Sequence, residues 1–407
     1  MSAKGRRNLV IGQSGGATAV INASLVGAFE TARENEHFDE IYGMRYGIEG
    51  LLKEDLIDLR RQPASLWPRL RTTPGAALGS CRYKLKNDDP EHILALFQHY
   101  QIHDMLYLGG NDSAETSHRL AQAAQQQGYD LRVISVPKTI DNDLPYTDHC
   151  PGYGTAARFI ALATMHATMN MLALPKEYPV KFIETMGRDA GWLVAASALG
   201  KREEHDSPHL LLCPEHAFNE DAFLKQVETI YQQLGYVVIV SSEALRDEKG
   251  QPVGALVETD AFGHTMVSGV AERLTEIVRD TLHLRASFDK PGDIQWNGIS
   301  RTDSDEAYMV GQAAVRALLE GKSDLMVTLV REEGPAYRCT TGSIELSKVA
   351  DQQRVLPDTF LNESKTMVTR SFYDYALPLL GDPLPDYPKF EGNMPPGSKL
   401  RTARCGS

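Results

Sequence analysis

The stretch NLVIGQSGGAT, residues 8–18, joins a short apolar run to a turn that is rich in glycine. The apolar run indicates a buried strand from Asn8 to Ile11. The turn opens a helical pattern near Thr18 to Glu30. A strand that passes through a glycine turn into a helix is the first part of a βαβ unit, so the stretch favours an α/β fold.

Further strands and helices continue this alternation along the chain. Apolar runs from Asp104 to Leu108 and from Leu131 to Val136 flank a helical pattern from about Ser113 to Gln127. Val180 to Glu184 and Tyr236 to Val240 indicate buried strands in the second half. This alternation predicts parallel sheets covered by helices on both faces, with ligands bound at the carboxyl ends of the strands.

The size and charge of the chain limit the classes of partner. Its 407 residues suffice for two domains that share a cleft. The formal net charge of −12 argues against a binding surface for nucleic acid or for an anionic membrane, so neither is expected as a partner. A substrate that is itself a polyanion needs a local cluster of Arg and Lys against this background.

Targeting signals and metal-binding cysteine pairs are not evident in the sequence. The apolar run near the amino terminus is too short for a signal peptide, and no apolar stretch approaches the roughly 20 residues of a membrane span. The cysteines are odd in number, scattered and without a CxxC pair: Cys81, Cys150, Cys213, Cys339 and Cys405. We expect free thiols, no zinc site and a cytoplasmic location.

Two glycine turns between a strand and a helix are suited to an anion. Residues 12–18 (GQSGGAT) include Gly15 and Gly16, where backbone N–H groups can approach a phosphate at the start of a helix. Residues 109–113 (GGNDS) add Asp112, a carboxylate of the kind that a Mg²⁺–phosphate complex needs. Each turn alone has a structural alternative, because tight glycine turns and Asp helix caps are common.

The segment PKTIDNDL, residues 137–144, carries the most specific pattern. Asp141 and Asp143 follow a strand end, so one carboxylate can take a proton from an attacking hydroxyl while the other is held or bound to metal. Lys138, just before them, can neutralise charge on a transferring phosphoryl group. A solvated loop is the alternative, and the two phosphate-type turns earlier in the chain disfavour it.

A fourth motif places Arg188 just past a strand, in residues 184–192 (ETMGRDAGW), where it can grip a bridging phosphate oxygen or lie on the surface at a helix start. The glycine loop, GGNDS, PKTIDNDL and MGR, in this order, resemble the phosphofructokinases. The resemblance covers about residues 8 to 345, and the pair TIDND and MGR is highly specific.

The resemblance implies an α/β fold of two Rossmann-like three-layer domains, with largely parallel sheets and the active site in the cleft between them. It implies a phosphoryl-donor domain of residues 1–153 plus about 296–345 and an acceptor domain of 154–295 plus about 346–380. A tail rich in Pro and Gly, residues 381–407, follows. A homo-oligomer, dimer or tetramer, is also expected.

Two positions resemble the pyrophosphate-dependent branch of the family. ATP-dependent members usually carry Gly where Lys138 and Asp112 stand. The Lys fills space that an α-phosphate needs, and Asp112 adds size and charge where the nucleoside would pass, so ATP is excluded. We therefore expect Mg²⁺-dependent transfer from pyrophosphate to a sugar-type hydroxyl, a reaction of glycolysis, with fructose 6-phosphate as the family's default acceptor.

The resemblance also assigns roles to individual residues. Asp141 is the general base on the acceptor hydroxyl. Three residues stabilise the transferring phosphoryl group: Lys138, Thr139 and Arg188. The donor is held by the glycine loop, the loop of residues 74–86 and one helix start: Gly15, Gly16, Arg82, Lys86 and Ser113. The acceptor set is Asp143, Met186, Gly187, Glu243, Asp293, Trp296, Arg285 and Arg301.

The metal site departs from the pattern of the family. Asn111 replaces the usual first carboxylate of its turn and is a neutral, weaker ligand. Mg²⁺ is then expected to rest on Asp112 and on the pyrophosphate itself, with Asp143 near it.

The acceptor pocket departs from the binding of fructose 6-phosphate. The family carries an Arg just before the strand that leads into MGR, and Pro179 stands there in this sequence. In the segment GDIQW, Asp293 replaces the family's His or Tyr, and Trp296 replaces its Arg. Each lost charge-assisted bond to a phosphate costs roughly 1.5–3 kcal/mol. Either Arg285, Lys290 or Arg301 supplies the phosphate site from a nearby position, or the acceptor is an unphosphorylated sugar or polyol such as myo-inositol.

Other functional classes fit only parts of the pattern. An NAD-type or lipid-type kinase also shows a Gly-Gly-acid turn, but TIDND argues against it. A non-enzymatic sensor would be favoured if the base or Lys138 were missing, and both are present. A nicotinamide dehydrogenase is disfavoured because no GxGxxG follows the first strand.

Overall fold

The computed structural model describes five stretches of the chain: residues 7–254, 256–259, 265–296, 298–350 and 352–388. The side chains of Asp293 and Trp296 lie outside the described part, as do residues 389–407 of the predicted tail. None of the helices in the described stretches has the length and apolar character that a membrane crossing requires.

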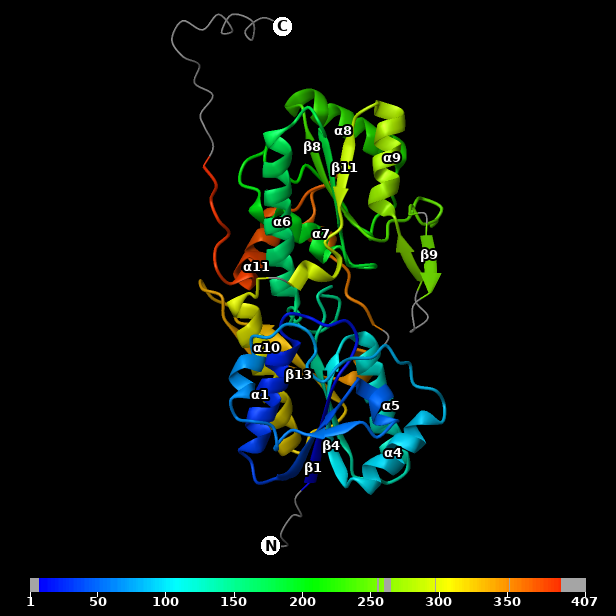
Figure 1. Cartoon of the computed structure of the whole chain (residues 1–407), viewed down its shortest axis with the longest axis vertical. Helices are drawn as coiled ribbons and strands as arrows, with labels where there is room; N and C mark the ends of the chain where they lie inside the picture. Colours follow the sequence, from blue (N-terminus) through cyan, green and yellow to red (C-terminus); the bar gives the residue numbers. More distant parts are fainter. Residues whose placement is uncertain (1–6, 255, 260–264, 297, 351, 389–407) are drawn as a thin grey trace, which may run out of the picture.

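The first of two main sheets occupies one end of the molecule (Figure 1). Its strand order is β13-β12-β5-β4-β1-β2-β3, parallel except for the edge strands β13 and β3. The strands are β1 (Arg7–Gln13), β2 (Phe38–Met44), β3 (Leu56–Asp58), β4 (Ile102–Gly109), β5 (Arg132–Pro137), β12 (Leu325–Arg331) and β13 (Cys339–Glu345). The central strand β1 is buried throughout, as expected for a parallel strand covered on both faces.

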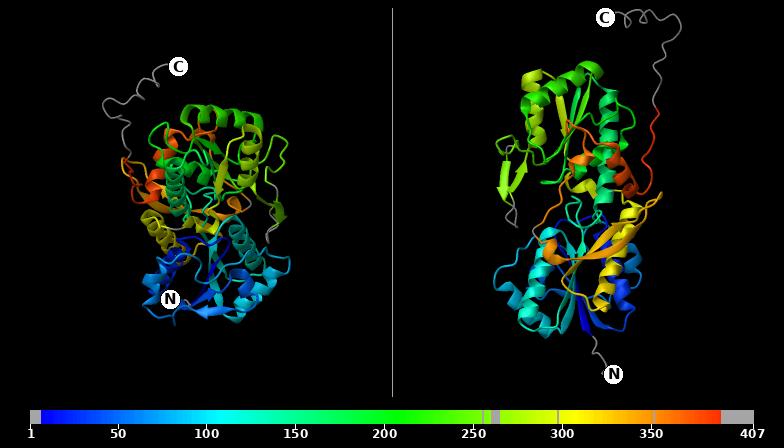
Figure 2. Two further views of the ribbon diagram at one scale, coloured as in Figure 1. Left: turned by 45° about the horizontal axis from the view of Figure 1, so that its top comes forward. Right: turned by 180° about the vertical axis from the view of Figure 1, so that it is seen from behind.

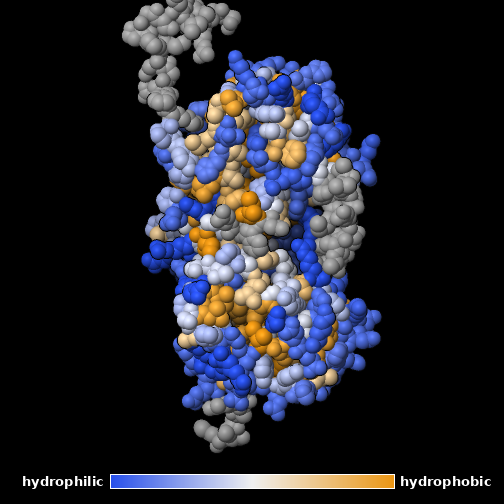
Figure 3. All heavy atoms as spheres, viewed as in Figure 1, coloured by the Kyte–Doolittle hydropathy of each residue, from blue (hydrophilic) through white to orange (hydrophobic). Residues whose placement is uncertain are grey.

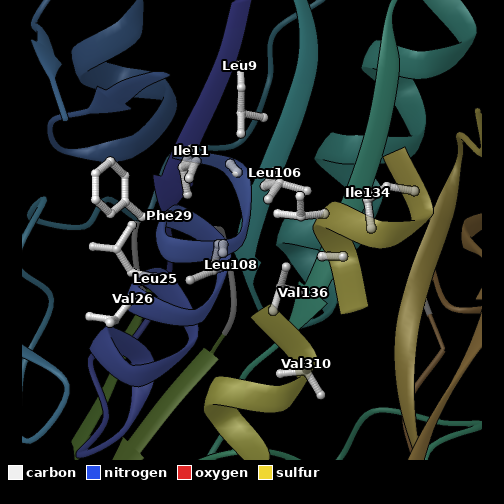
Figure 4. Packing of buried hydrophobic residues seen from close by; sticks show 14 of the residues in the cluster. Leu9, Ile11, Leu25, Val26, Phe29, Leu106, Leu108, Ile134, Val136 and Val310 are labelled. Atoms are coloured by element: carbon white, nitrogen blue, oxygen red, sulfur yellow. The ribbon is translucent and has the colours of Figure 1, made fainter. Parts of the chain in front are cut away.

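Helices cover both faces of this sheet. On one face lie α1 (Ile21–Arg33), α3 (Leu66–Leu70) and α10 (Arg301–Leu319), and on the other α2 (Gly47–Leu51), α4 (Asp89–His99) and α5 (Asn111–Gln126). Figure 4 shows how Leu9 and Ile11 of β1 pack with Leu25 and Phe29 of α1 and with Val310 of α10. This burial of apolar side chains holds the strand ends in place.

The second main sheet occupies the opposite end of the molecule in all the views of Figures 1 and 2. Its order is β11-β6-β8-β7, all parallel, with β6 (Val180–Thr185), β7 (Leu210–Leu212), β8 (Val237–Ser242) and β11 (Ala286–Asp289). Helices α6 (Tyr153–Ala173), α7 (Trp192–Ala196) and α11 (Arg370–Ala376) pack on one side, and α8 (Glu220–Leu234) and α9 (Val270–Leu282) on the other.

Smaller elements complete the chain. They are the hairpin of β9 (Leu256–Thr259) and β10 (Thr265–Ser268), and the 3-10 turns η1 (Ser197–Gly200), η2 (Gly292–Trp296), η3 (Leu346–Lys348), η4 (Asp358–Phe360) and η5 (Leu377–Leu380). The mixed α/β fold with largely parallel sheets agrees with the prediction from the sequence. The strands of the first sheet fall within residues 7–137 and 325–345 and those of the second within 180–289, and on this order we propose the domain boundaries given above.

Candidate active site

A cleft of about 600 Å³ lies between the two sheets, at the carboxyl ends of strands from both. Figure 3 shows the surface hollowed between the two halves, with hydrophilic residues around the hollow. The turns after β1, β4 and β5 line one side, and the turns after β6 and β8 line the other. The site therefore has the position that open parallel sheets favour for ligands.

The glycine turn after β1 is held against a buried lysine. Gly15 has a φ of 75°, and a side chain there would begin 3.1 Å from Lys138 Nζ. Lys138 Nζ donates a hydrogen bond of 2.7 Å to Gly16 O, and Gly15 N donates one of 3.0 Å to Cys81 O. Burial of Lys138 lowers its pKa to about 8, although Asp143 and Asp141 oppose the shift.

The turn after β4 adds a helix start to the same side of the cleft. Helix α5 begins at Asn111, and Asp112 and Ser113 in its first turn line the cleft. A side chain at Gly109 would begin 2.0 Å from Ser113 Oγ, so only glycine allows this close approach. Lys138 N donates to Gly109 O at 3.0 Å, which ties this turn to the next one.

Asp141 and Asp143 lie in the turn after β5 and line the cleft. Burial raises the pKa of both carboxyls, and repulsion from Asp143 and Glu243 raises that of Asp141 further. Asn111 Nδ2 donates to Asp143 Oδ2 at 3.1 Å. The Oδ1 atoms of Asp141, Asp143 and Asn111 are buried and have no hydrogen-bond partner among the described residues. A bound ligand can supply the missing partner.

The backbone of this turn is fixed at Asn142, which is buried and has a φ of 57°. Its Oδ1 accepts from Cys150 N at 3.0 Å, and its Nδ2 donates to Tyr375 Oη at 2.9 Å. The Arg354 guanidinium donates to Asn142 O at 2.8 Å and to Thr147 O at 2.6 Å. These contacts hold the flanking carboxylates in position although the left-handed conformation is unfavourable for most residues.

A buried charge network lies behind the same turn. His149 Nδ1 is 2.8 Å from Asp148 Oδ2, and His149 Nε2 is 2.6 Å from Glu306 Oε2 of α10. Asp148 also accepts hydrogen bonds from Arg331, and Glu306 accepts one from Tyr337. Burial alone would lower the pKa of His149, but the bonds to Asp148 and Glu306 outweigh it and raise the pKa to about 9.

The opposite side of the cleft carries Met186, Arg188 and Glu243. Glu243 N donates to Thr185 O at 2.9 Å, and Gly187 O accepts from Ser242 Oγ at 2.8 Å, so the turns after β6 and β8 are joined. Burial raises the pKa of Glu243 to about 7, and Arg188 counteracts this. The charge of Arg188 also opposes the rise in the pKa of Asp141, so the two side chains lie close to each other across the cleft.

Four residues expected in the site do not line the cleft: Lys86, Gly187, Arg285 and Arg301. Gly187 lies between two lining residues, Met186 and Arg188, and has a φ of 107°. Lys86 is exposed, and its backbone N donates to Asp89 Oδ2 at 2.6 Å. Arg301 is exposed at the first position of α10, and the backbone of Gly381 packs against its N–H. Lys86 was expected from the resemblance of residues 74–86 to a donor-binding loop, and Arg301 from its nearness in sequence to the acceptor segment; neither side chain lines the cleft.

Arg285 lies at the far end of the second sheet. It precedes β11, whose first residue pairs with Val180, and Val180 N donates to Arg285 O at 3.4 Å. The five steps from Val180 to Thr185 correspond to roughly 17 Å along the strand, at about 3.3 Å per residue. The guanidinium of Arg285 instead pairs with Glu177 at 3.2 Å.

The cleft lining also includes residues that the sequence had not assigned to the site, among them Arg246, Gln295, Gln352 and Gln353. Arg246 follows Glu243 by three residues, and Gln295 belongs to the segment GDIQW, so both had a local signal. Gln353 Nε2 lies 3.4 Å from Asp143 Oδ2, yet nothing in its sequence context marks it.

Comparison with known proteins adds three findings. The sequence model of a family described as Phosphofructokinase matches residues 8–318. A pyrophosphate–fructose 6-phosphate 1-phosphotransferase from Halomonas elongata is 37% identical over 409 residues, 98% of this chain and 97% of the relative. A sulfofructose kinase from Alkalicoccus urumqiensis is 33% identical over 361 residues, 88% of this chain and 92% of the relative.

A solved structure shows the same arrangement. The crystal structure of a pyrophosphate-dependent phosphofructokinase from Marinobacter aquaeolei superimposes with a TM-score of 0.84 at 36% identity, covering 96% of this chain and 95% of the other. The fold, including its two layered halves, is therefore shared with a relative of similar length.

Proposed function

The chain belongs to the phosphofructokinase family, and we propose that it transfers a phosphoryl group from inorganic pyrophosphate to the 1-hydroxyl of fructose 6-phosphate. It is an enzyme of the transferase class that acts on a sugar hydroxyl. The observation that carries the donor assignment is the buried ammonium of Lys138, which lies against the glycine turn at Gly15 and Gly16. A relative matched over nearly its whole length is named for this reaction.

The donor side supports pyrophosphate in preference to ATP. Lys138 occupies the space next to the glycine turn and supplies a cation there, and Asp112 stands in the first turn of α5 with its carboxylate at the cleft. Pyrophosphate is compact and is attracted by the positive charge of Lys138. The α-phosphate and nucleoside of ATP would clash with the side chain of Lys138 and be repelled by the carboxylate of Asp112. Arg82 lines the same side and is proposed to neutralise the outer phosphate.

The chemical step is proposed to use Asp141 as the base that accepts the proton of the attacking hydroxyl. Its raised pKa brings a carboxylate closer to the range in which a general base works best. Thr139 Oγ1 accepts from Asp141 N at 3.1 Å and holds the turn. Arg188 and Lys138 are proposed to stabilise charge on the transferring group, so catalysis depends mainly on positioning and electrostatics.

A divalent metal, in general use in this family, fits the residues that are present. The unpartnered oxygens of Asn111 and Asp143 are oxygen ligands of the type that Mg²⁺ prefers. No cluster of three His, Cys, Asp or Glu side chains suited to a metal occurs in the part of the chain that the structure describes. We therefore propose that Mg²⁺ is held by Asp112, Asp143 and Asn111 together with pyrophosphate, whose charge it would neutralise.

The alternative of an unphosphorylated polyol as acceptor is not favoured, because a relative that matches this chain over 98% of its length is named for fructose 6-phosphate. Met186 and Glu243 are proposed to contact the sugar, since both line the side of the cleft opposite the donor turns. A cytoplasmic location and a homo-oligomeric state remain proposals from the sequence.

The test is a comparison of donors at saturating fructose 6-phosphate and Mg²⁺. Pyrophosphate should support turnover and ATP at most a trace, whereas equal rates with both would contradict the donor assignment. The double variant Lys138→Gly, Asp112→Gly should relax the exclusion of ATP while lowering the rate with pyrophosphate. The matched control Lys322→Gly, Asp324→Gly changes the same residue types in the turn before β12, outside the cleft.

A further inference from the structure

The acceptor side of the cleft contains an arginine that the roles above leave unassigned. Arg246 lines the cleft with Glu243, Gly292 and Gln295, and its side chain is exposed. Building on the proposed function, we propose that Arg246 binds the oxyanion at the end of the acceptor sugar remote from the reacting hydroxyl. Such a group is required if the acceptor carries a charged 6-substituent, since unpaired anions bind weakly.

The backbone on which Arg246 stands is well fixed. Phe218 N donates to Arg246 O at 2.8 Å, and Asp247 N donates to Gln251 O at 2.8 Å, so the segment forms a short hairpin. Asp247 Oδ1 accepts from Lys249 N at 2.9 Å and from Gln251 N at 2.7 Å and closes its turn. The side chain therefore projects from a defined point beside the cleft, and it is exposed.

The guanidinium has donors left for a ligand. Among the described residues, its hydrogen bond is from NH1 to Gly250 O, at 3.2 Å. A guanidinium has five N–H donors in a planar fork, and the fork matches two oxygens of a phosphate or a sulfonate. Arg246 can thus keep its contact with the hairpin and still bind an oxyanion through its other edge.

The position of Arg246 corresponds to the outer end of an acceptor. The positive charges of Arg188 and Lys138 both favour the ionised form of Asp141, so these side chains lie near the reacting hydroxyl. The negative charge of Glu243 disfavours that form, so Glu243 lies near Asp141 as well. Arg246 stands three residues beyond Glu243, which separates their Cα atoms by at most about 10 Å of chain. A sugar that offers its hydroxyl to Asp141 and contacts Glu243 can therefore reach Arg246 with its other end, because both residues line the same cleft.

Neighbouring cations are less suited to this role. Lys290 Nζ is 3.1 Å from Glu184 Oε1 and 3.2 Å from Glu272 Oε1, so two carboxylates already neutralise it. Arg285 lies at the opposite end of the sheet. Arg246 is within the cleft, and the described residues show no ion pair that compensates its charge.

The ligand chemistry is a tetrahedral oxyanion on the terminal carbon of a sugar. A phosphate ester and a sulfonate share this chemistry, and the relatives named above include enzymes for fructose 6-phosphate and for sulfofructose. Both groups offer three oxygens to a guanidinium, so the geometry of Arg246 fits either one. Direct comparison of the two acceptors distinguishes them.

The experiment measures kcat and KM of the full chain with pyrophosphate and three acceptors: fructose 6-phosphate, 6-deoxy-6-sulfofructose and fructose. Arg246→Ala should lower kcat/KM for the preferred anionic acceptor by about 10- to 100-fold, mainly through KM, as expected for one charge-assisted hydrogen bond. Arg246→Lys should recover part of this loss. Activity with fructose and the KM of pyrophosphate should not change, and Arg279→Ala on the surface of α9 is the matched control.

The two proposals fail in different ways. An unchanged kcat/KM for the anionic acceptors in Arg246→Ala, or an equal loss with fructose, would overturn the role of Arg246 and leave the proposed function intact. A wild-type enzyme that accepts 6-deoxy-6-sulfofructose but not fructose 6-phosphate would overturn the proposed function, whereas loss of that activity in Arg246→Ala would still support the inference. If neither sugar turns over, calorimetric binding of fructose 6-phosphate that is equal in wild type and Arg246→Ala would overturn the assignment, and weaker binding in the variant would support it.

Discussion

The donor side of the cleft is lined mainly by three turns that each follow a parallel strand of the first sheet, with Arg82 added from the loop of residues 74–86, whereas the acceptor side draws on segments of several kinds. The donor turns follow β1, β4 and β5, which are adjacent in the sheet, so their motifs become neighbours as soon as the sheet forms. The acceptor side combines two strand ends with η2 and with Gln352 and Gln353. A motif after a parallel strand is therefore a better guide to a site than a charged residue near a motif.

This comparison predicts that the largest loss of activity comes from the donor half. Asp141→Asn keeps the shape of the side chain but removes the proton acceptor, and kcat should fall by about 10²- to 10⁴-fold. Steady-state kinetics with pyrophosphate and fructose 6-phosphate measures this. The KM of pyrophosphate should change much less, and Asp280→Asn on the surface of α9 should be neutral. A variant that retains most of its turnover would show that Asp141 is not the base.

A second variant isolates the acceptor half. Glu243→Gln replaces a carboxylate, which accepts strong hydrogen bonds from sugar hydroxyls, with a neutral amide. Because these hydrogen bonds become weaker, the KM of the acceptor should rise by about 10-fold or more. The KM of pyrophosphate should stay unchanged, because the donor turns lie on the other side of the cleft. Glu276→Gln on α9 is the control. An equal rise in both KM values would mean that the two halves do not bind their substrates separately.

The buried network of His149, Asp148 and Glu306 should make the stability of the protein depend on pH. The pKa of His149 is about 9 in the folded chain, above the unfolded value of about 6.5, so its stabilisation is complete below about pH 6.5 and is lost as pH rises through 9. The difference in Tm between wild type and His149→Gln should therefore be largest near pH 6 and shrink toward pH 9.5. The stabilisation at stake is on the order of 3 kcal/mol.

Thermal unfolding of both proteins across this pH range is the measurement. His92→Gln on the exposed face of α4 serves as the control and should follow the wild type at every pH. A difference in Tm that stays constant from pH 6 to 9.5 would show that His149 is held in its neutral form.

The smallest effects are expected at the two arginines that the sequence suggested for the acceptor. Arg285→Ala and Arg301→Ala should each change kcat/KM for fructose 6-phosphate by less than about twofold, as for surface substitutions. Arg285 pairs with Glu177 at the far end of the second sheet, and Arg301 is exposed at the start of α10. A large loss at either one would mean that another copy of the chain completes the acceptor site.

The order of strands and motifs could be predicted from the sequence because the physical causes are local. An apolar run, a glycine turn and a helix start follow one another within a few residues, as at residues 8–18, and the carboxyl ends of parallel strands meet at one edge of a sheet. The clustering of Asp112, Lys138 and Asp141 follows from this alone, and the structure brings all three to one cleft. Their individual roles in catalysis remain predictions.

The acceptor side was decided by the tertiary structure. Gln353 reaches Asp143 only because the chain after β13 crosses back over the cleft, and Arg285 is excluded only because β11 runs parallel to β6. The raised pKa values of Asp141 and Glu243 likewise result from burial and from carboxylates brought together from different strands. The sequence by itself determined which chemical groups the chain carries and which turns hold them. The packing of the two sheets decided which of those groups share one cleft, because distances between segments far apart in the chain depend on how the elements pack.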